Sequence, residues 1–175
     1  MGKSRTPVFQ TTRIALREVR ADDVENFYSL FRDARVMRYI ADGKVGTRND
    51  AAATVARARR NYDLYPGMGK WVAEEKSGSR FIGWFSLNYI PGTVDIEIGY
   101  WLLPVAWGHG YATEGATALA RHGLGQLGLY RIIGVTHPDN VASQRVLQKA
   151  GMRDAGWGRY YNRELRLFVA ETTTR

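Results

Sequence analysis

The chain has 175 residues, which is enough for one domain with a sizeable core and short for two. It contains no Cys, which excludes a disulfide framework, a thiolate zinc site and a cysteine nucleophile. The formal net charge of +8 favours an anionic cofactor, an acidic acceptor or nucleic acid. No helix-turn-helix pairing, zinc finger or aromatic RNA-binding signature accompanies that charge, so we expect no specific nucleic-acid partner.

Signals for a membrane or for export are not found in the sequence. No apolar run reaches the roughly 18–20 residues needed to span a bilayer. The first residues, MGKSRTPVFQTT, lack the apolar core of a signal peptide. We therefore expect a soluble cytoplasmic protein without a membrane partner.

The chain is predicted to begin with a strand and a helix. Residues 13–19 alternate apolar and polar side chains and predict the first strand. Asp22, followed three residues later by Glu25, predicts a capping box at the start of a helix. That helix has an apolar stripe that includes Phe27 and Leu30, so it is expected to pack on the sheet.

Two more helical segments are expected before the central strands. A short one covers residues 35–39, ahead of a turn at residues 42 and 43. Thr47 and Asp50 form a second candidate capping box, which heads an Ala-rich helix running to about residue 65. Pro66 and Gly67 end this helix.

The middle of the chain is predicted to form an antiparallel meander. Residues 70–75 and 80–89 are typical of a hairpin that turns at residues 76–78, and Pro91-Gly92 leads into a third strand. This third strand, residues 95–102, alternates apolar side chains with β-branched and aromatic members. Pro104 ends it, because proline cannot donate to a strand ladder.

A glycine loop that opens directly into a helix follows this strand. Gly108 and Gly110 precede a helix expected from residue 111 to about 127. Unpaired N–H groups and the positive end of the helix dipole make such a junction a candidate anion site. The two glycines alone also fit an ordinary turn. Thr113 stands where the dinucleotide fingerprint needs a third glycine, and no Gly-Lys-Ser/Thr phosphate loop is present.

The last third of the chain completes a sheet. Residues 131–136 suit a buried strand, Asn140 opens a helix, and Gly151 fits the position just after its end. Residues 157–161 and 165–170 predict a final hairpin turning at Asn162-Arg163. The fold class expected from these elements is α+β with a mixed sheet.

Two sequence blocks carry a resemblance to a known family. IEIGYWLLPVAWGHGYATEG, followed after one helix and strand by HPDNVASQRVLQKAGM, resembles the GNAT superfamily of N-acetyltransferases. The likeness is greatest to its ribosomal-protein N-terminal acetyltransferase branch, and it covers nearly the whole chain. It implies a single domain over residues 1–175. It also implies a largely antiparallel mixed sheet, splayed at two parallel strands and covered by helices on both faces.

The resemblance implies acetyl-CoA as the cofactor and places it between the strands at residues 95–102 and 131–136. Backbone groups of Leu102 and Leu103 would hold its pantetheine arm and polarise the thioester. Val105 departs from the Gln or Arg usual at that position of the family. Because the loop acts through its backbone, we interpret this departure as a feature of the branch. The backbone of six residues would bind the pyrophosphate: Gly108, His109, Gly110, Tyr111, Ala112 and Thr113.

The resemblance also assigns the second block to the cofactor and to proton transfer. Asn140 would bond the pantetheine arm, although Asn at this place is also an ordinary N-cap. Many members of the family have a Tyr acid seven residues later, where this chain has Leu147. In the ribosomal-protein branch a Ser three residues after the Asn serves instead, and Ser143 matches it.

A base is needed to keep the attacking amine neutral. Glu97 is the first candidate and Asp95 the second, while an ion pair between Glu97 and one of the many Arg residues is the alternative. Glu114 is expected to stabilise the start of its helix. The three His residues lack the spacing of metal ligands, so we expect no metal.

The predicted function is acetyl transfer from acetyl-CoA to a protein N-terminus or a small-molecule amine, by a monomer or homodimer. Tyr39, Tyr62 and Tyr65 are candidates for the acceptor pocket, with core packing as the alternative role of each. Two other functions stay open. One is a non-catalytic acyl-CoA-binding sensor, and the other is a basic ribosome- or RNA-associated protein with the same fold.

Overall fold

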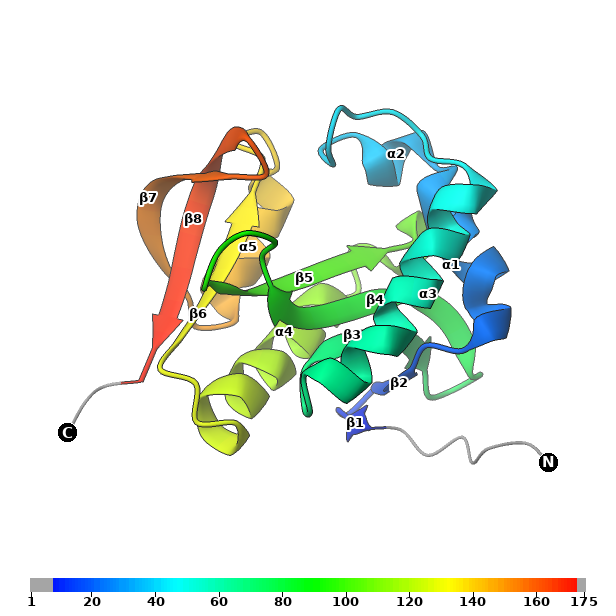
Figure 1. Ribbon diagram of the computed structural model, residues 1–175, viewed down its shortest axis with the longest axis horizontal. Coiled ribbons are helices and arrows are strands. Elements are labelled where there is room, and N and C mark those ends of the chain that lie inside the picture. Colours follow the sequence, from blue (N-terminus) through cyan, green and yellow to red (C-terminus); the bar gives the residue numbers. More distant parts are fainter. Residues whose placement is uncertain (1–7, 173–175) are drawn as a thin grey trace.

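The computed structural model describes residues 8–172, which form one eight-stranded sheet with helices on both faces (Figure 1). The strand order is β1-β2-β3-β4-β5-β6-β8-β7. The strands are β1 (Phe9–Gln10), β2 (Ile14–Glu18), β3 (Gly69–Glu75), β4 (Arg80–Tyr89), β5 (Ile96–Leu102), β6 (Arg131–Thr136), β7 (Arg153–Tyr160) and β8 (Arg163–Glu171). The helices are α1 (Val24–Phe31), α2 (Ala34–Met37), α3 (Arg48–Leu64), α4 (Tyr111–Arg121) and α5 (Val141–Lys149).

The sheet opens between β5 and β6. Every other neighbouring pair is antiparallel, whereas β5 and β6 are parallel and pair at one position, Glu97 opposite Ile133. In Figure 1 the β6–β8–β7 part of the sheet turns away from β5. The predicted α+β class, with a mixed sheet splayed at two parallel strands, is therefore confirmed.

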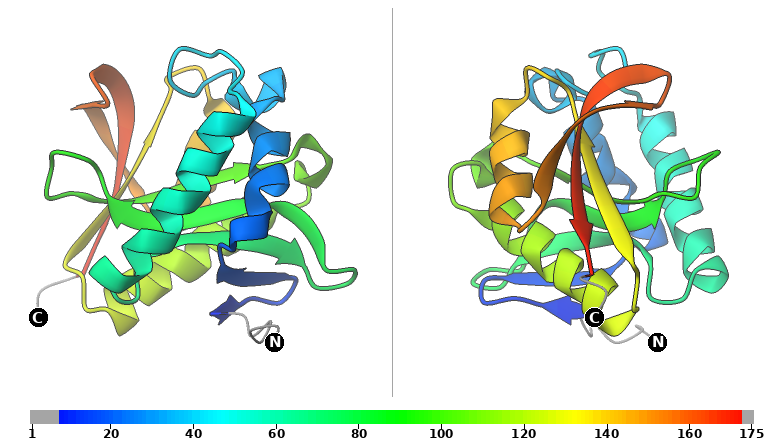
Figure 2. Two further views of the ribbon diagram at one scale, coloured as in Figure 1. Left: turned by 45° about the vertical axis from the view of Figure 1, so that its right-hand side comes forward. Right: turned by 90° about the vertical axis from the view of Figure 1, so that its left-hand side faces the viewer.

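The two faces of the sheet carry different helices (Figure 2). Helices α1 and α3 bury Phe27, Leu30 and Val55 against Trp84 of β4. Helices α4 and α5 cover the opposite face, with buried residues that include Ala116, Leu119, Leu147, Phe85 and Ile98. Gly115 allows α4 to approach β4 closely, because a Cβ there would lie 2.2 Å from the ring of Phe85.

One of the two predicted capping boxes is confirmed, and the other is wrong. The Asp50 amide donates to Thr47 Oγ1 (3.2 Å), and the Thr47 amide donates to the Asp50 carboxylate (2.7 Å). The box predicted at Asp22 does not form, because a 3₁₀ turn, Ala21–Asp23, precedes α1. The carboxylate of Asp23 binds the Arg20 amide (2.7 Å) instead, so the contact that forms begins at Arg20, two residues before the predicted N-cap.

Three other boundaries differ from the sequence prediction. The final hairpin turns at Tyr161 and Asn162, whose φ values of 54° and 59° are left-handed, rather than at Asn162-Arg163. The helix expected to run to residue 127 is α4 followed by a π-helical turn, His122–Gln126. Strand β1 was not predicted, because two residues show no periodicity. Within residues 8–172, none of the helices combines the length and the apolar character needed to cross a bilayer.

Candidate active site

The glycine loop presents free N–H groups at the start of α4. Gly108 and Gly110 have φ values of 77° and 81°, which only glycine adopts without strain. The first helical bond runs from the Glu114 amide to the Gly110 carbonyl (3.0 Å). The amides of residues 111–113 therefore donate to no acceptor within the described range 8–172. A Cβ on Gly108 would meet no atom within 4 Å, so this open junction fits a diphosphate.

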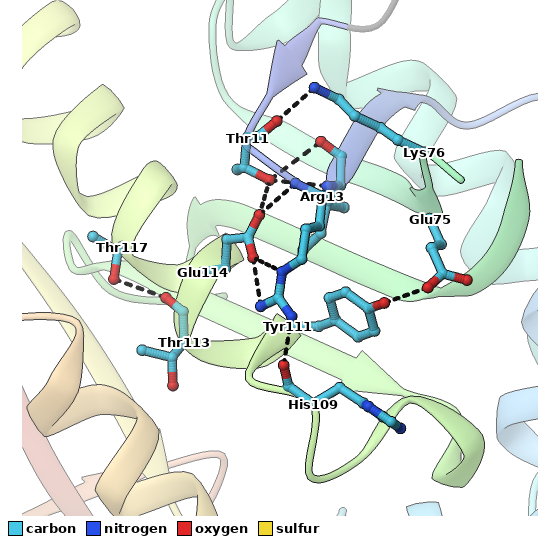
Figure 3. A network of polar contacts seen from close by, with 10 residues as sticks. Thr11, Arg13, Glu75, Lys76, His109, Tyr111, Thr113, Glu114 and Thr117 are labelled. Atoms are coloured by element: carbon cyan, nitrogen blue, oxygen red, sulfur yellow. Dashed lines mark hydrogen bonds and ion pairs between the residues drawn. The ribbon is translucent and has the colours of Figure 1, made fainter. Parts of the chain in front are cut away.

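The turn between β1 and β2 braces this loop (Figure 3). The Arg13 guanidinium donates to the His109 carbonyl (2.9 Å) and lies 2.7 Å from the Glu114 carboxylate. Glu114 also accepts hydrogen bonds from the hydroxyl of Thr11 (2.5 Å) and the amide of Arg13 (2.8 Å). Burial raises the pKa of Glu114, but these bonds outweigh it and hold that pKa below its usual value. Glu114 thus ties α4 to the β1–β2 turn.

Leu102 and Leu103 lie at the end of β5, where the sheet opens. The Leu103 amide donates to Ile82 of β4 (2.9 Å), and its carbonyl accepts from Ala106 (2.8 Å). Both backbone groups of Leu103 are therefore engaged within the protein. Successive N–H groups of a strand point to opposite edges, so the Leu102 amide points away from β4, toward the opening. Of the two residues, Leu102 keeps the backbone donor suited to pantetheine.

Asn140 and Ser143 share the first turn of α5. The Asn140 side-chain oxygen accepts from the Ser143 amide (3.1 Å), which is the N-cap contact that the sequence left open. The Ser143 hydroxyl lies 2.8 Å from the hydroxyl of Tyr100 on β5. Burial raises the pKa of Tyr100, so its phenol stays protonated. Tyr100 was expected only as an apolar strand residue, and its contact with Ser143 is a feature that the sequence did not reveal.

Glu97 lies on the same strand as Tyr100. Its carboxylate accepts from the Tyr161 hydroxyl (2.5 Å), contributed by the β7–β8 turn. Burial raises the pKa of Glu97 to about 7, against the opposing effects of Tyr161, Lys70 and the Val135 amide. No Arg or Lys nitrogen of residues 8–172 lies within 4.0 Å of this carboxylate. Within this range, therefore, Glu97 does not form the ion pair with an Arg residue that was its alternative role.

The second candidate base, Asp95, is held differently. Its carboxylate forms an ion pair with Arg131 and accepts from the Tyr160 hydroxyl (2.8 Å). Asp95 therefore already has a cationic partner, whereas Glu97 has no Arg or Lys nitrogen within 4.0 Å in residues 8–172. Glu97 is therefore the better placed of the two.

Glu97 and Tyr100 project to opposite faces of β5, because they are three residues apart on a strand. The Glu97 face is covered by α1 and α3, and the Tyr100 face is covered by α4 and α5. A carboxylate from one face and a pair of hydroxyls from the other thus flank the opening between β5 and β6. An acyl donor in that opening would have a base on one side and a proton donor on the other.

The three tyrosines considered for the acceptor pocket have different surroundings. The Tyr62 hydroxyl accepts from the Val19 amide (2.9 Å), so this phenol holds two strands together. Tyr65 packs against Tyr89, with ring centroids 5.3 Å apart. Tyr39 lies 5.3 Å from the His137 ring, next to the end of β6, and it remains a candidate. In residues 8–172 no group of three or more His, Asp or Glu residues is arranged to hold a metal ion.

Comparison with known proteins identifies the family to which this geometry belongs. The sequence model described as "Acetyltransferase (GNAT) domain" matches residues 13–153, which include the glycine loop, Glu97 and Ser143. The chain belongs to the GNAT acetyltransferase family. As a member it is an acyltransferase that uses acetyl-CoA, and the resemblance seen in its sequence is confirmed.

Two relatives and one solved structure illustrate this GNAT membership. An uncharacterized N-acetyltransferase of Bacillus subtilis, YnaD, is 33% identical over 148 residues, 84% of this chain and 83% of that protein. The FsC-acetyl coenzyme A-N(2)-transacetylase of Aspergillus fumigatus is 30% identical over 154 residues, and the match spans 83% of this chain but only 65% of that longer protein. RimL, a ribosomal alpha-N-protein acetyltransferase solved with coenzyme A, has the same fold (TM-score 0.76, 18% identity, 95% of this chain and 97% of that one).

Proposed function

We propose that residues 1–175 act as a single acyltransferase domain that acetylates a primary amine, either a protein N-terminus or a small-molecule amine. The amine would attack directly in a ternary complex with acetyl-CoA, without an acyl-enzyme. The observation that carries this proposal is the placement of Glu97 and the Tyr100–Ser143 pair on either side of the opening between β5 and β6. Bound acetyl-CoA supplies the activated acetyl thioester.

Glu97 is the proposed general base. An α-amine with a pKa of about 8 is only about one-tenth neutral at pH 7, so a mild base suffices to remove its proton. A carboxylate whose pKa is about 7 is half ionised at that pH and is well matched to this task. Tyr161 would position the carboxylate through its hydrogen bond.

Ser143 is the proposed proton donor to the departing thiolate, with Tyr100 as its neighbour. A thiol pKa of about 8.5 means that the thiolate is disfavoured by only roughly 2 kcal/mol at pH 7. Position therefore matters more than acidity, and the Asn140 cap fixes where Ser143 lies. The proposed cofactor-binding residues are Leu102, Gly108, His109, Gly110, Tyr111, Ala112, Thr113, Asn140 and Ser143. Leu103 is left out because its amide and its carbonyl are both bonded within the protein. Within that set, the Leu102 amide serves pantetheine and the amides of residues 111–113 serve the phosphates.

The test is an initial-rate assay of CoA thiol release over a matrix of acetyl-CoA and amine concentrations. Direct attack gives intersecting double-reciprocal lines, and parallel lines would indicate an acyl-enzyme. Glu97→Gln should lower kcat/KM by about 10²–10⁴-fold.

The pH dependence of the same assay separates the base from other roles of Glu97. With an acceptor whose amine pKa lies well below 7, kcat/KM should rise with pH up to about 7 and then level off, because only ionised Glu97 accepts a proton. Glu97→Gln should remove this ascending limb. An unchanged rate and limb in both Glu97→Gln and Ser143→Ala would contradict the roles proposed for these residues. Acetyl-CoA binding without any transfer, unchanged in both variants, would favour the sensor, and salt-sensitive RNA binding without transfer would favour the ribosome-associated alternative. The cytoplasmic location and the oligomeric state stay predictions.

A further inference from the structure

The face of the sheet that carries Glu97 also carries a lysine. Lys70 of β3 lies opposite Ser86 of β4, which lies opposite Gly99 of β5. One position along the sheet, Asn88 lies opposite Glu97. Directly opposed residues point to the same face, and so do residues two apart. Lys70, Asn88 and Glu97 therefore share the face beneath α1 and α3.

Lys70 lacks an anionic partner on this face. Its Nζ lies 3.0 Å from the ring centroid of Trp84 and 5.9 Å from that of Trp101. In residues 8–172 no oxygen accepts a hydrogen bond from this Nζ, and no carboxylate lies within 4.0 Å of it. Burial, and then the nearby charge of Arg57 on α3, lower the pKa of Lys70 well below its ordinary value, which Glu97 only partly opposes. An anion placed beside Lys70 would stabilise its charged form and oppose this lowering of its pKa.

Within residues 8–172, two buried side-chain polar atoms on the same face have no hydrogen-bond partner. They are the indole N–H of Trp84 and the side-chain oxygen of Asn88. Most buried polar groups of native proteins are hydrogen-bonded, so two such atoms on the face that carries the Lys70 amino group indicate a place for a ligand. The donor, Trp84, lies beside Lys70, and the acceptor, Asn88, lies beside Glu97. The patch thus has a donor end and an acceptor end.

We propose that the acceptor is a small aminocarboxylate, whose carboxylate binds Lys70 and the Trp84 indole while its amine lies at Glu97 and Asn88. This inference rests on the proposed function, because it narrows the acceptor of the same site. The carboxylate would supply the anion that Lys70 and Arg57 lack. The amine would donate to the free oxygen of Asn88 and give its proton to Glu97.

The same arrangement disfavours other amines. A polyamine would bring further positive charge next to Lys70 and Arg57, which costs free energy through like-charge repulsion. A protein N-terminus has a neutral peptide group next to its amine, so it would leave Lys70 without an anion.

The test compares acceptors that differ only in the carboxylate. A panel of L-amino acids and their matching α-amides is assayed by CoA thiol release with the native enzyme, Lys70→Met and Lys149→Met. Lys149 is an exposed residue at the end of α5 and serves as the matched control. A hydrogen bond to a charged group should make the best amino acid better than its amide by about tenfold to a hundredfold in kcat/KM.

Lys70→Met should reduce the ratio of the two kcat/KM values, amino acid over amide, to near one, mainly by lowering kcat/KM for the amino acid. Lys149→Met should leave this ratio unchanged. The inference is overturned if the native enzyme has the same kcat/KM for amides as for amino acids. It is also overturned if Lys70→Met lowers kcat/KM equally for both kinds of acceptor, which is the effect expected from loss of a general base. Thermal melting of each variant shows that it is folded. Absence of thiol release with every amine, despite measurable acetyl-CoA binding, would overturn the proposed function itself and this inference with it.

Discussion

At the scale of single residues, the proposed chemistry depends on Glu97 and Tyr100, whose pKa values are raised by burial. In residues 8–172 Glu97 has no Arg or Lys nitrogen within 4.0 Å, so burial outweighs the bonds from Tyr161 and the Val135 amide and raises its pKa to about 7. Asp95, two residues away, is paired with Arg131. We therefore propose a catalytic role for Glu97 alone, because the partners of the two carboxylates differ.

The raised pKa of Glu97 has a consequence for stability. Between the ordinary value of 4.5 and about 7, the folded chain holds a proton that the unfolded chain has lost, so stability falls as pH rises through this window. Each pKa unit corresponds to about 1.4 kcal/mol, so the loss above pH 7 is on the order of 3 kcal/mol. Glu97→Gln should therefore raise the free energy of unfolding at pH 8 by up to this amount and change it little at pH 4. Urea titrations at both pH values measure it, and a variant less stable at pH 8 would contradict the assignment.

At the scale of elements, long-range pairs fix where the helices begin. Arg17 of β2 forms a bidentate pair with Asp23 ahead of α1 (2.8 Å for each bond) and also binds Glu74 of β3 (2.8 Å). Burial works against the carboxylate of Asp23, but its bonds to Arg17 and to its other donors hold its pKa below the ordinary value. This cluster anchors α1, which covers the face that carries Glu97.

Removal of Asp23 should be costly, because it leaves the guanidinium of Arg17 buried with one partner fewer. Asp23→Ala is expected to lower the free energy of unfolding by about 3 kcal/mol. Asp22→Ala is the matched control, since Asp22 is exposed and makes no box, and it should change stability by less than about 0.5 kcal/mol. Chemical denaturation of both variants tests this. If both variants lost the same free energy of unfolding, the turn at residues 21–23 would act through its negative charge and not through the pair between Asp23 and Arg17.

The sequence predicted the elements better than the contacts between them. The strand at residues 95–102, the glycine loop and the Thr47 box follow from local patterns, and the structure confirms them. The capping box predicted at Asp22 was wrong because the next residue, Asp23, pairs with the buried Arg17, which lies six residues before it in the chain. The partners of Glu97 and Ser143 could not be predicted, because Tyr161 and Tyr100 reach them only through the strand order of the folded sheet. The role of Lys70 depends in the same way on the register of three strands.

At the scale of the whole molecule, two halves of one sheet separate at β5 and β6, and the proposed site uses both sides of the opening (Figure 1). The helix that starts at the glycine loop covers one face, and the helices over Glu97 and Lys70 cover the other (Figure 2). The net charge of +8 adds a long-range attraction for an anionic cofactor. The proposed acetyl transfer therefore requires that acetyl-CoA binds at the loop that begins α4.

Calorimetric titration of acetyl-CoA tests that claim most directly, with Gly108→Leu and Gly92→Leu as the compared variants. Both glycines are left-handed (φ of 77° and 76°), and a Cβ on either would meet no atom within 4 Å, so the backbone strain of about 1–2 kcal/mol is matched. Only Gly108 lies in the loop. We expect micromolar binding by the native chain and by Gly92→Leu, and a loss of at least about tenfold in Gly108→Leu. Equal affinities for the two variants, or no binding by the native chain at millimolar acetyl-CoA, would contradict the account.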